Sequence, residues 1–91
     1  MISGKVQGVF FRAHTEEIAR SLNLKGWVRN LSNGSVEAVF EGKKEDIASM
    51  LVWCKKGPRL ANVEKVAVID EPYLGEHKQF SILSSPSSKN P

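Results

Sequence analysis

Two adjacent residues, Asn33 and Gly34, constrain the fold of this chain more than any other pair. Asn-Gly is the strongest short-range signal for a β-hairpin, because both residues tolerate the positive φ angles of a tight turn. Segments of strand composition lie on either side, at residues 25–31 and 35–41, and the second alternates apolar and polar residues. We therefore predict an antiparallel hairpin with one buried face near the centre of the chain.

Segments with helical periodicity flank this hairpin. Apolar residues recur every three or four positions in residues 11–23 and again in residues 43–56. The second segment has acidic residues in its first turn and lysines in its last, which suits the helix dipole, and Gly57 and Pro58 end it. Both segments are predicted to be amphipathic helices with one buried face.

The order of the elements predicts the fold. A short strand at residues 1–6 precedes the first helix, a strand at 63–69 follows the second, and residues 79–83 form a short last strand. This order, βαββαβ plus a short C-terminal strand, is the split β-α-β pattern of an α+β, ferredoxin-like sandwich. We expect residues 1–83 to form an antiparallel sheet of four to five strands with two helices on one face. Residues 84–91, rich in serine, are expected to be a disordered tail.

Composition narrows the class of protein. The chain has 91 residues, 41% of them hydrophobic and 25% charged, which is typical of one globular domain. No run approaches the roughly 18 apolar residues of a membrane span, and the N-terminus lacks a secretory signal pattern. The lone cysteine, Cys54, cannot form an internal disulfide. We therefore expect a cytoplasmic protein without membrane association, whose net charge of +3 suits anionic small molecules.

A glycine-containing stretch from Gly4 to Arg12 lies where the first strand gives way to a helix. Glycine allows backbone angles at which successive N–H groups converge on one point, and the helix start adds unpaired N–H groups. Arg12 would supply a planar fork of donors for two phosphate oxygens. The pattern predicts an oxyanion cradle, although it is not the spacing of a nucleotide P-loop. The alternative is a glycine-rich turn followed by a surface arginine.

Asn30 is the candidate for a second role at this site. A water that attacks phosphorus needs a polar group to position it, and an amide oxygen can accept a hydrogen bond from that water. In a split β-α-β fold the loop before the first helix and the end of the following strand can lie close together, so Arg12 and Asn30 can meet. The alternative for Asn30 is a polar residue that merely flanks the hairpin.

These stretches resemble the signatures of a known family, the acylphosphatases. Residues 2–12 (ISGKVQGVFFR) are similar to the first signature. Residues 26–30 (GWVRN), with Gly-Ser-Val at 34–36 and then Gly42, are similar to the second. Further matches extend the resemblance over about residues 2–83: Trp53, Gly57, Pro58, Ala61 and Val63. Two features depart from the family pattern, since the first strand is shorter than in most relatives and Leu31 stands where many relatives carry Thr.

The resemblance implies hydrolysis of the carboxyl–phosphate bond of acyl phosphates to a carboxylate and inorganic phosphate, with no metal or cofactor. It implies that Arg12 and the backbone N–H groups of residues 7–12 bind the phosphoryl group, while Asn30 orients the attacking water. The phosphate-binding candidates are Gln7, Gly8, Val9, Phe10, Phe11 and Arg12. Thr15, one turn after Phe11, is a candidate supporting residue. Inorganic phosphate is then the expected competitive inhibitor, and the enzyme is expected to be a monomer.

The remaining polar and charged residues favour other interpretations less. We expect His14 on the helix surface, His77 in a solvated loop and Cys54 as a buried inert thiol. The two histidines and the cysteine do not have the spacing of metal ligands. RNA-binding domains of this fold present aromatic residues on central strands, whereas Glu37 and Glu41 would repel a phosphate backbone, so we expect no nucleic-acid partner. The closer alternative is a domain that binds phosphate or carbamoyl phosphate in a recognition or regulatory role.

Overall fold

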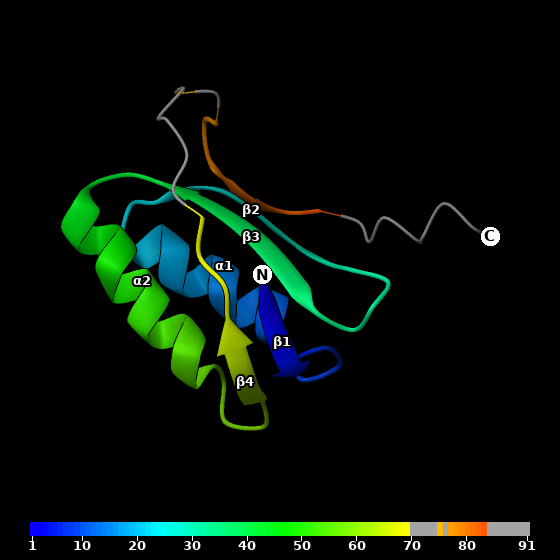
Figure 1. Ribbon diagram of the computed structural model, residues 1–91. Coiled ribbons are helices and arrows are strands. Elements are labelled where there is room, and N and C mark those ends of the chain that lie inside the picture. The colour runs from blue at the N-terminus through cyan, green and yellow to red at the C-terminus, as the bar shows by residue number, and fades with distance from the viewer. Residues whose placement is uncertain (70–74, 76, 84–91) are drawn as a thin grey trace.

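The computed structural model describes residues 1–69, 75 and 77–83 (Figure 1). In chain order the elements are β1 (Ile2–Lys5), α1 (Phe11–Ser21), β2 (Lys25–Asn30), β3 (Val36–Glu41), α2 (Lys44–Lys56), β4 (Asn62–Val66) and β5 (Phe80–Ile82). The predicted element order is confirmed, with the fourth strand ending at Val66, three residues earlier than expected. The tail expected at residues 84–91 lies outside the described residues.

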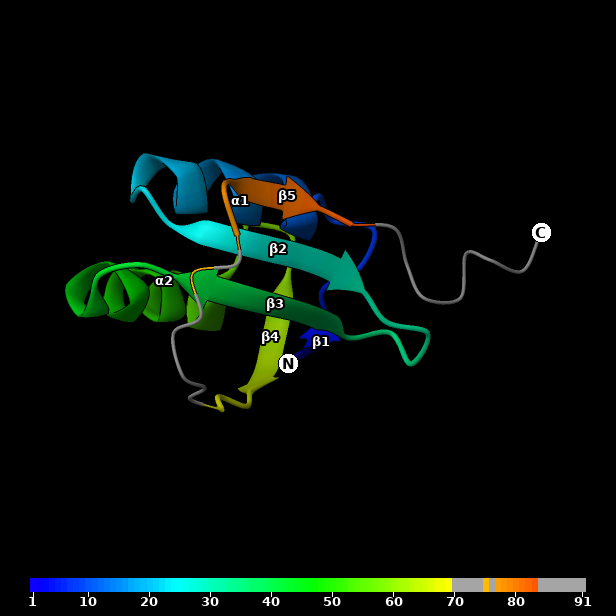
Figure 2. The ribbon, with the colours of Figure 1, turned by 90° about the horizontal axis from the view of Figure 1, so that it is seen from above.

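The strands form one sheet in the order β4-β1-β3-β2-β5 (Figure 2). Pairing is antiparallel between β1 and β3, β1 and β4, and β2 and β3. The expectation of a wholly antiparallel sheet needs one correction, because β5 pairs parallel to β2, with Gly26 opposite Phe80. The reason is topological: the pairings make β4 run opposite to β2, towards the end of the sheet at which β2 begins. The chain enters β5 at that end, with Phe80 opposite Gly26, and so runs in the direction of β2.

The central hairpin is confirmed, but its turn differs from the tight Asn-Gly turn. Residues 25–30 pair with 36–41 without a break, which leaves a five-residue loop at 31–35. Gly34 has a positive φ of 91° whereas Asn33 does not, so only the glycine supplies the unusual backbone angle. The Asn33 side chain instead accepts a hydrogen bond from the backbone N–H of Ser35 at 3.0 Å. Asn33 thus stabilises the loop through its side-chain oxygen.

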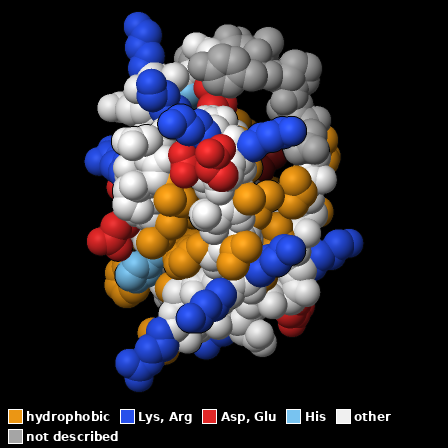
Figure 3. All heavy atoms as spheres, turned by 90° about the vertical axis from the view of Figure 1, so that its left-hand side faces the viewer, with side chains coloured by type: hydrophobic (Ala, Val, Ile, Leu, Met, Phe, Trp, Pro, Cys, Tyr) orange, Lys and Arg blue, Asp and Glu red, His pale blue; other side chains and the backbone are white. Residues whose placement is uncertain are grey.

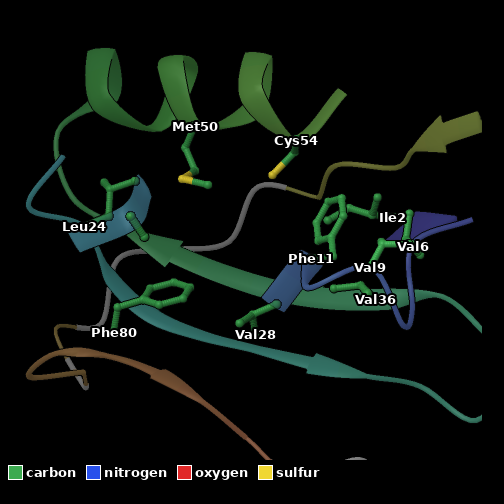
Figure 4. Packing of buried hydrophobic residues seen from close by; sticks show 11 residues of the cluster. Ile2, Val6, Val9, Phe11, Leu24, Val28, Val36, Met50, Cys54 and Phe80 are labelled. Carbon is green, nitrogen blue, oxygen red and sulfur yellow. The ribbon is translucent and has the colours of Figure 1, made fainter. Parts of the chain in front are cut away.

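One hydrophobic core lies between the sheet and the two helices (Figure 4). Met50 and Cys54 point into it from α2, and Phe11 enters it at the start of α1. The Phe11 ring contacts the Trp53 ring with 5.4 Å between centroids. Burying a side chain of this size stabilises the fold by roughly 1.5–3 kcal/mol. Because Phe11 directly precedes Arg12, the same packing fixes the position of that arginine.

The surface carries mixed charge rather than a single-sign patch on the face that Figure 3 shows. Lys and Arg side chains lie there among hydrophobic and acidic ones. Among the described residues, no helix has the length and apolar character needed to cross a membrane.

Cys54 is predicted to make the protein less stable in alkaline solution. Burial raises the pKa of this thiol from 9.0 to about 12. Because the folded pKa lies above the unfolded one, this contribution to stability is complete below about pH 9 and is lost as pH rises towards 12. Urea unfolding at about pH 8 and pH 10.5 should therefore show a larger loss of stability in the wild type than in Cys54→Ala. An equal loss in both chains would show that the thiol remains free to ionise in the folded state.

Candidate active site

The loop between β1 and α1, residues 6–10, is called here the cradle loop. Two of its residues have left-handed backbone angles: Gly8 with φ 75°, and Phe10 with φ 61° and ψ 27°. A side chain at position 8 would meet open space, so glycine is needed there for its φ angle and not for room. Phe10 is the N-cap of α1, yet no side chain caps the helix. The first N–H groups of α1 are therefore without a capping side chain and are available to an anion.

Gln7 ties the cradle loop to the hairpin. Its Nε2 donates hydrogen bonds to the carbonyl oxygens of Leu31 at 2.7 Å and Ser35 at 2.9 Å. These two acceptors lie at either end of the hairpin loop, and Leu31 directly follows Asn30. The sequence pattern predicts a role for Gln7 only through its backbone N–H group. The sequence did contain a sign of the side-chain role: Gln7 has an amide nitrogen with two donor hydrogens, and it lies in a loop, directly before Gly8.

Arg12 and Asn30 line the same hollow, called here the site hollow. It has a volume of about 300 Å³ and is lined by Val6, Gly8, Phe10, Phe11, Arg12, Ala13, Asn30 and Ile82. The structure thus brings together the start of α1 and the end of β2, as their places in a split β-α-β fold predict. Gly8, Phe10 and Phe11 of the cradle sequence also reach this hollow.

The guanidinium of Arg12 is lightly held. Its Nη1 lies 3.5 Å from the carbonyl oxygen of Leu83, at the outer limit of a hydrogen bond. In the part of the chain that the structure describes, no carboxylate forms an ion pair with Arg12. The side chain of Asn30 likewise makes no hydrogen bond to another described residue. Both groups retain their capacity to bind a ligand.

The remaining candidate residues lie away from the site hollow. Val9 is buried in the core. Thr15 is also fully buried, and its hydroxyl donates to the carbonyl oxygen of Phe11 at 2.7 Å. Thr15 therefore contacts the last residue before Arg12 without lining the hollow. His14 is exposed beside Glu17, with 3.6 Å between Nδ1 and Oε1. Among the described residues, His, Cys, Asp and Glu side chains form no group of three that could hold a metal ion.

A larger hollow of about 420 Å³ lies at the other end of α1, with Arg20, Asn23, Leu24, Lys25, Gln79 and Phe80 in its walls. Its arginine is already engaged, since Arg20 lies 3.1 Å from a carboxylate oxygen of Glu16 and donates to the carbonyl oxygen of Phe80 at 3.2 Å. The site hollow is smaller, but it combines a helix start with an arginine that has no carboxylate partner and an asparagine amide that has no hydrogen bond within the described part of the chain. It is therefore the better candidate for an active site.

Gln7→Met is predicted to loosen the cradle loop. The substitution keeps the size of the side chain but removes both hydrogen bonds, so we expect the free energy of unfolding to fall by about 1–3 kcal/mol. The inhibition constant of inorganic phosphate should rise several-fold, because the loop N–H groups are no longer held in place. Urea unfolding and phosphate inhibition measure the two effects, and Gln79→Met is the matched control. Unchanged phosphate inhibition in Gln7→Met would mean that the loop keeps its shape without this amide.

The chain is similar to acylphosphatases in both sequence and structure. The acylphosphatase family model matches residues 1–82. The acylphosphatase of Syntrophus aciditrophicus is 52% identical over 82 residues, which cover 90% of this chain and 85% of that protein. That of Syntrophobacter fumaroxidans is 51% identical over 81 residues, covering 89% and 84%. The crystal structure of acylphosphatase from Bacillus subtilis has a TM-score of 0.87 at 34% identity and covers 90% of this chain and 91% of that chain.

Proposed function

The chain belongs to the acylphosphatase family of enzymes, and from that premise we propose how its own residues hydrolyse acyl phosphates. The observation that carries the proposal is that Arg12 and Asn30 line one hollow beside a loop with two left-handed residues. The substrates of this family are small-molecule acyl phosphates. The proposal concerns which groups bind the phosphate and which group acts on the water.

The phosphoryl group is bound by the backbone N–H groups of residues 7–12 together with the guanidinium of Arg12. Left-handed residues at Gly8 and Phe10 support this role, because alternating backbone angles direct successive N–H groups to the same side. The uncapped start of α1 adds the positive end of a helix dipole. Arg12, which has no carboxylate partner among the described residues, contributes a full positive charge and two parallel donors.

Asn30 orients the water that attacks phosphorus. Its amide oxygen accepts a hydrogen bond from the water and thereby aims a lone pair of the water oxygen at the phosphorus atom. The place of Asn30 at the end of β2 supports this role, because a side chain on a paired strand is held more rigidly than one on a loop. The carbonyl oxygen of Leu31, the residue after Asn30, accepts a hydrogen bond from Gln7, so Leu31 contributes to the shape of the site through its backbone.

The reaction needs no strong base. The water oxygen forms a bond to phosphorus, the bond from phosphorus to the acyl oxygen breaks, and the carboxylate leaves with the electron pair. Acyl phosphates carry a good leaving group and react through a loose transition state, so positioning and charge stabilisation supply most of the catalysis. Among the described residues, those that line the site hollow include no carboxylate and no imidazole. The proton of the water therefore passes to an oxygen of the substrate's own phosphate.

Hydrolysis of benzoyl phosphate in oxygen-18-labelled water tests this mechanism. Direct attack at phosphorus places the label in inorganic phosphate, whereas attack at the carbonyl carbon places it in benzoate. A pH–rate profile provides a second test, because transfer of the proton to substrate requires no ionised enzyme group near neutrality. Label in benzoate would contradict the proposed attack at phosphorus, and a profile that required an ionised histidine or carboxylate would contradict the proposed proton transfer.

The alternative role, a domain that binds phosphate without turning over a substrate, is disfavoured by the presence of both Arg12 and Asn30 at one hollow. A single chain supplies all the residues named in the mechanism, which supports a monomeric enzyme. Sedimentation at the concentration used for kinetics tests the monomer, and an active species found only as a dimer would overturn it.

A further inference from the structure

The site hollow has an apolar part beside its polar one, with Phe10 and Ile82 in its wall. We propose that these two side chains bind the acyl group of the substrate and select acyl phosphates with large apolar acyl groups, aromatic or branched, over those with an acetyl group. This inference rests on the proposed function and assigns a second set of contacts in the same hollow.

Phe10 has an environment that the folded chain alone does not explain. The residue is 74% exposed. Its backbone is left-handed, a conformation that glycine adopts easily but that is unfavourable for a bulky residue such as phenylalanine. The ring therefore neither packs in the core nor suits its backbone angles. An apolar group of a ligand that covered the ring would bury this exposed apolar surface, which is favourable.

The floor beneath Phe10 is apolar as well. Val6 and Phe11 also line the hollow, and they are only 1% and 2% exposed. Ala13, on the first turn of α1, adds a further methyl group to the wall. The polar residues that line the hollow include Arg12 and Asn30. This combination of a largely apolar wall with a few convergent polar groups is typical of a site for a small molecule with one charged end.

Ile82 is brought to the hollow by the parallel strand β5. It is opposite Val28 on β2, and Asn30 lies two residues further along β2 than Val28. Residues two apart on a strand point to the same face of a sheet, so Ile82 and Asn30 lie on the face that α1 covers. Ile82 is 39% exposed there. The strand that departs from the antiparallel pattern thus supplies the second apolar residue of the wall.

Two variants and two substrates test the proposal. Phe10→Ala removes the ring and keeps the backbone N–H group, while Ile82→Thr keeps a β-branched residue on the strand and replaces apolar surface with a hydroxyl. For each, kcat/KM is measured with benzoyl phosphate and with acetyl phosphate. The ratio of the two values is expected to fall about tenfold in Phe10→Ala and several-fold in Ile82→Thr, in line with lost apolar contact. Val52→Ala, at a 68% exposed position on α2, should leave the ratio and the activity unchanged.

Inhibition by inorganic phosphate separates acyl contact from damage to the cradle loop, because phosphate has no acyl group. In Phe10→Ala, we expect the fold decrease in kcat/KM for benzoyl phosphate to be about ten times larger than the fold change in the phosphate inhibition constant. Equal changes in both would overturn it, since Phe10 would then act only through the loop backbone. An unchanged substrate ratio in both variants would also overturn it. A wild-type protein that hydrolyses neither substrate would instead contradict the proposed function.

Discussion

Arg12→Ala is expected to lose activity and phosphate binding together. The substitution removes the only side-chain cation among the described residues that line the site hollow, so both the bound phosphate and the transition state lose their charged partner. We expect kcat/KM to fall by about 1,000-fold or more, the scale seen when an arginine is withdrawn from a transferring phosphoryl group. The inhibition constant of phosphate should rise about 10- to 100-fold, since hydrogen bonds to charged groups contribute roughly 1.5–3 kcal/mol.

Arg59→Ala is the matched control for this variant, because Arg59 is exposed in the turn between α2 and β4 and lies outside the hollow. Arg12→Lys keeps the charge but not the fork of donors, and we expect it to recover part of the binding and little of the rate. An Arg12→Ala protein that still bound phosphate tightly would show that the backbone N–H groups suffice and that our assignment of Arg12 to binding is wrong.

Asn30→Ala is expected to separate binding from turnover. Loss of one preorganised polar group that acts in the transition state lowers kcat by roughly 100-fold or more. Phosphate inhibition should change by less than about twofold, because the water that Asn30 orients is not part of the bound product. Steady-state kinetics with phosphate as the inhibitor measures both quantities, and Asn62→Ala on the exposed edge strand β4 is the control.

The two variants are most informative together. Loss of binding in Arg12→Ala with retained binding in Asn30→Ala would support the division of labour between the two residues. If Asn30→Ala also failed to bind phosphate, Asn30 would belong to the cradle, and the water would need another partner.

The elements that could be predicted from the sequence are those with a strong local pattern. Helix α2 carries a stripe of apolar residues and clear signals at both ends, and the structure places it at Lys44–Lys56. The hairpin followed from Asn-Gly between two strand-like segments. The meeting of Arg12 and Asn30 followed from the order of the elements, because a split β-α-β fold carries both to one end of the sheet.

Features that depend on contacts between distant residues could not be predicted in the same way. The parallel pairing of β5 depends on the direction in which β4 runs relative to β2, which no local pattern records. The hydrogen bonds from Gln7 reach residues 24 and 28 positions away, and the sequence names neither acceptor. The left-handed backbone of Phe10 contradicts local preference, so no local pattern predicts it.

The measurement that tests the central claim most directly is hydrolysis of benzoyl phosphate by the purified protein in excess chelator, with inorganic phosphate as the inhibitor. If an arginine and backbone N–H groups hold the phosphate and an asparagine positions the water, turnover persists without metal and phosphate inhibits it competitively. A folded protein that binds phosphate but does not hydrolyse benzoyl phosphate, or that loses its activity to the chelator, would contradict this account.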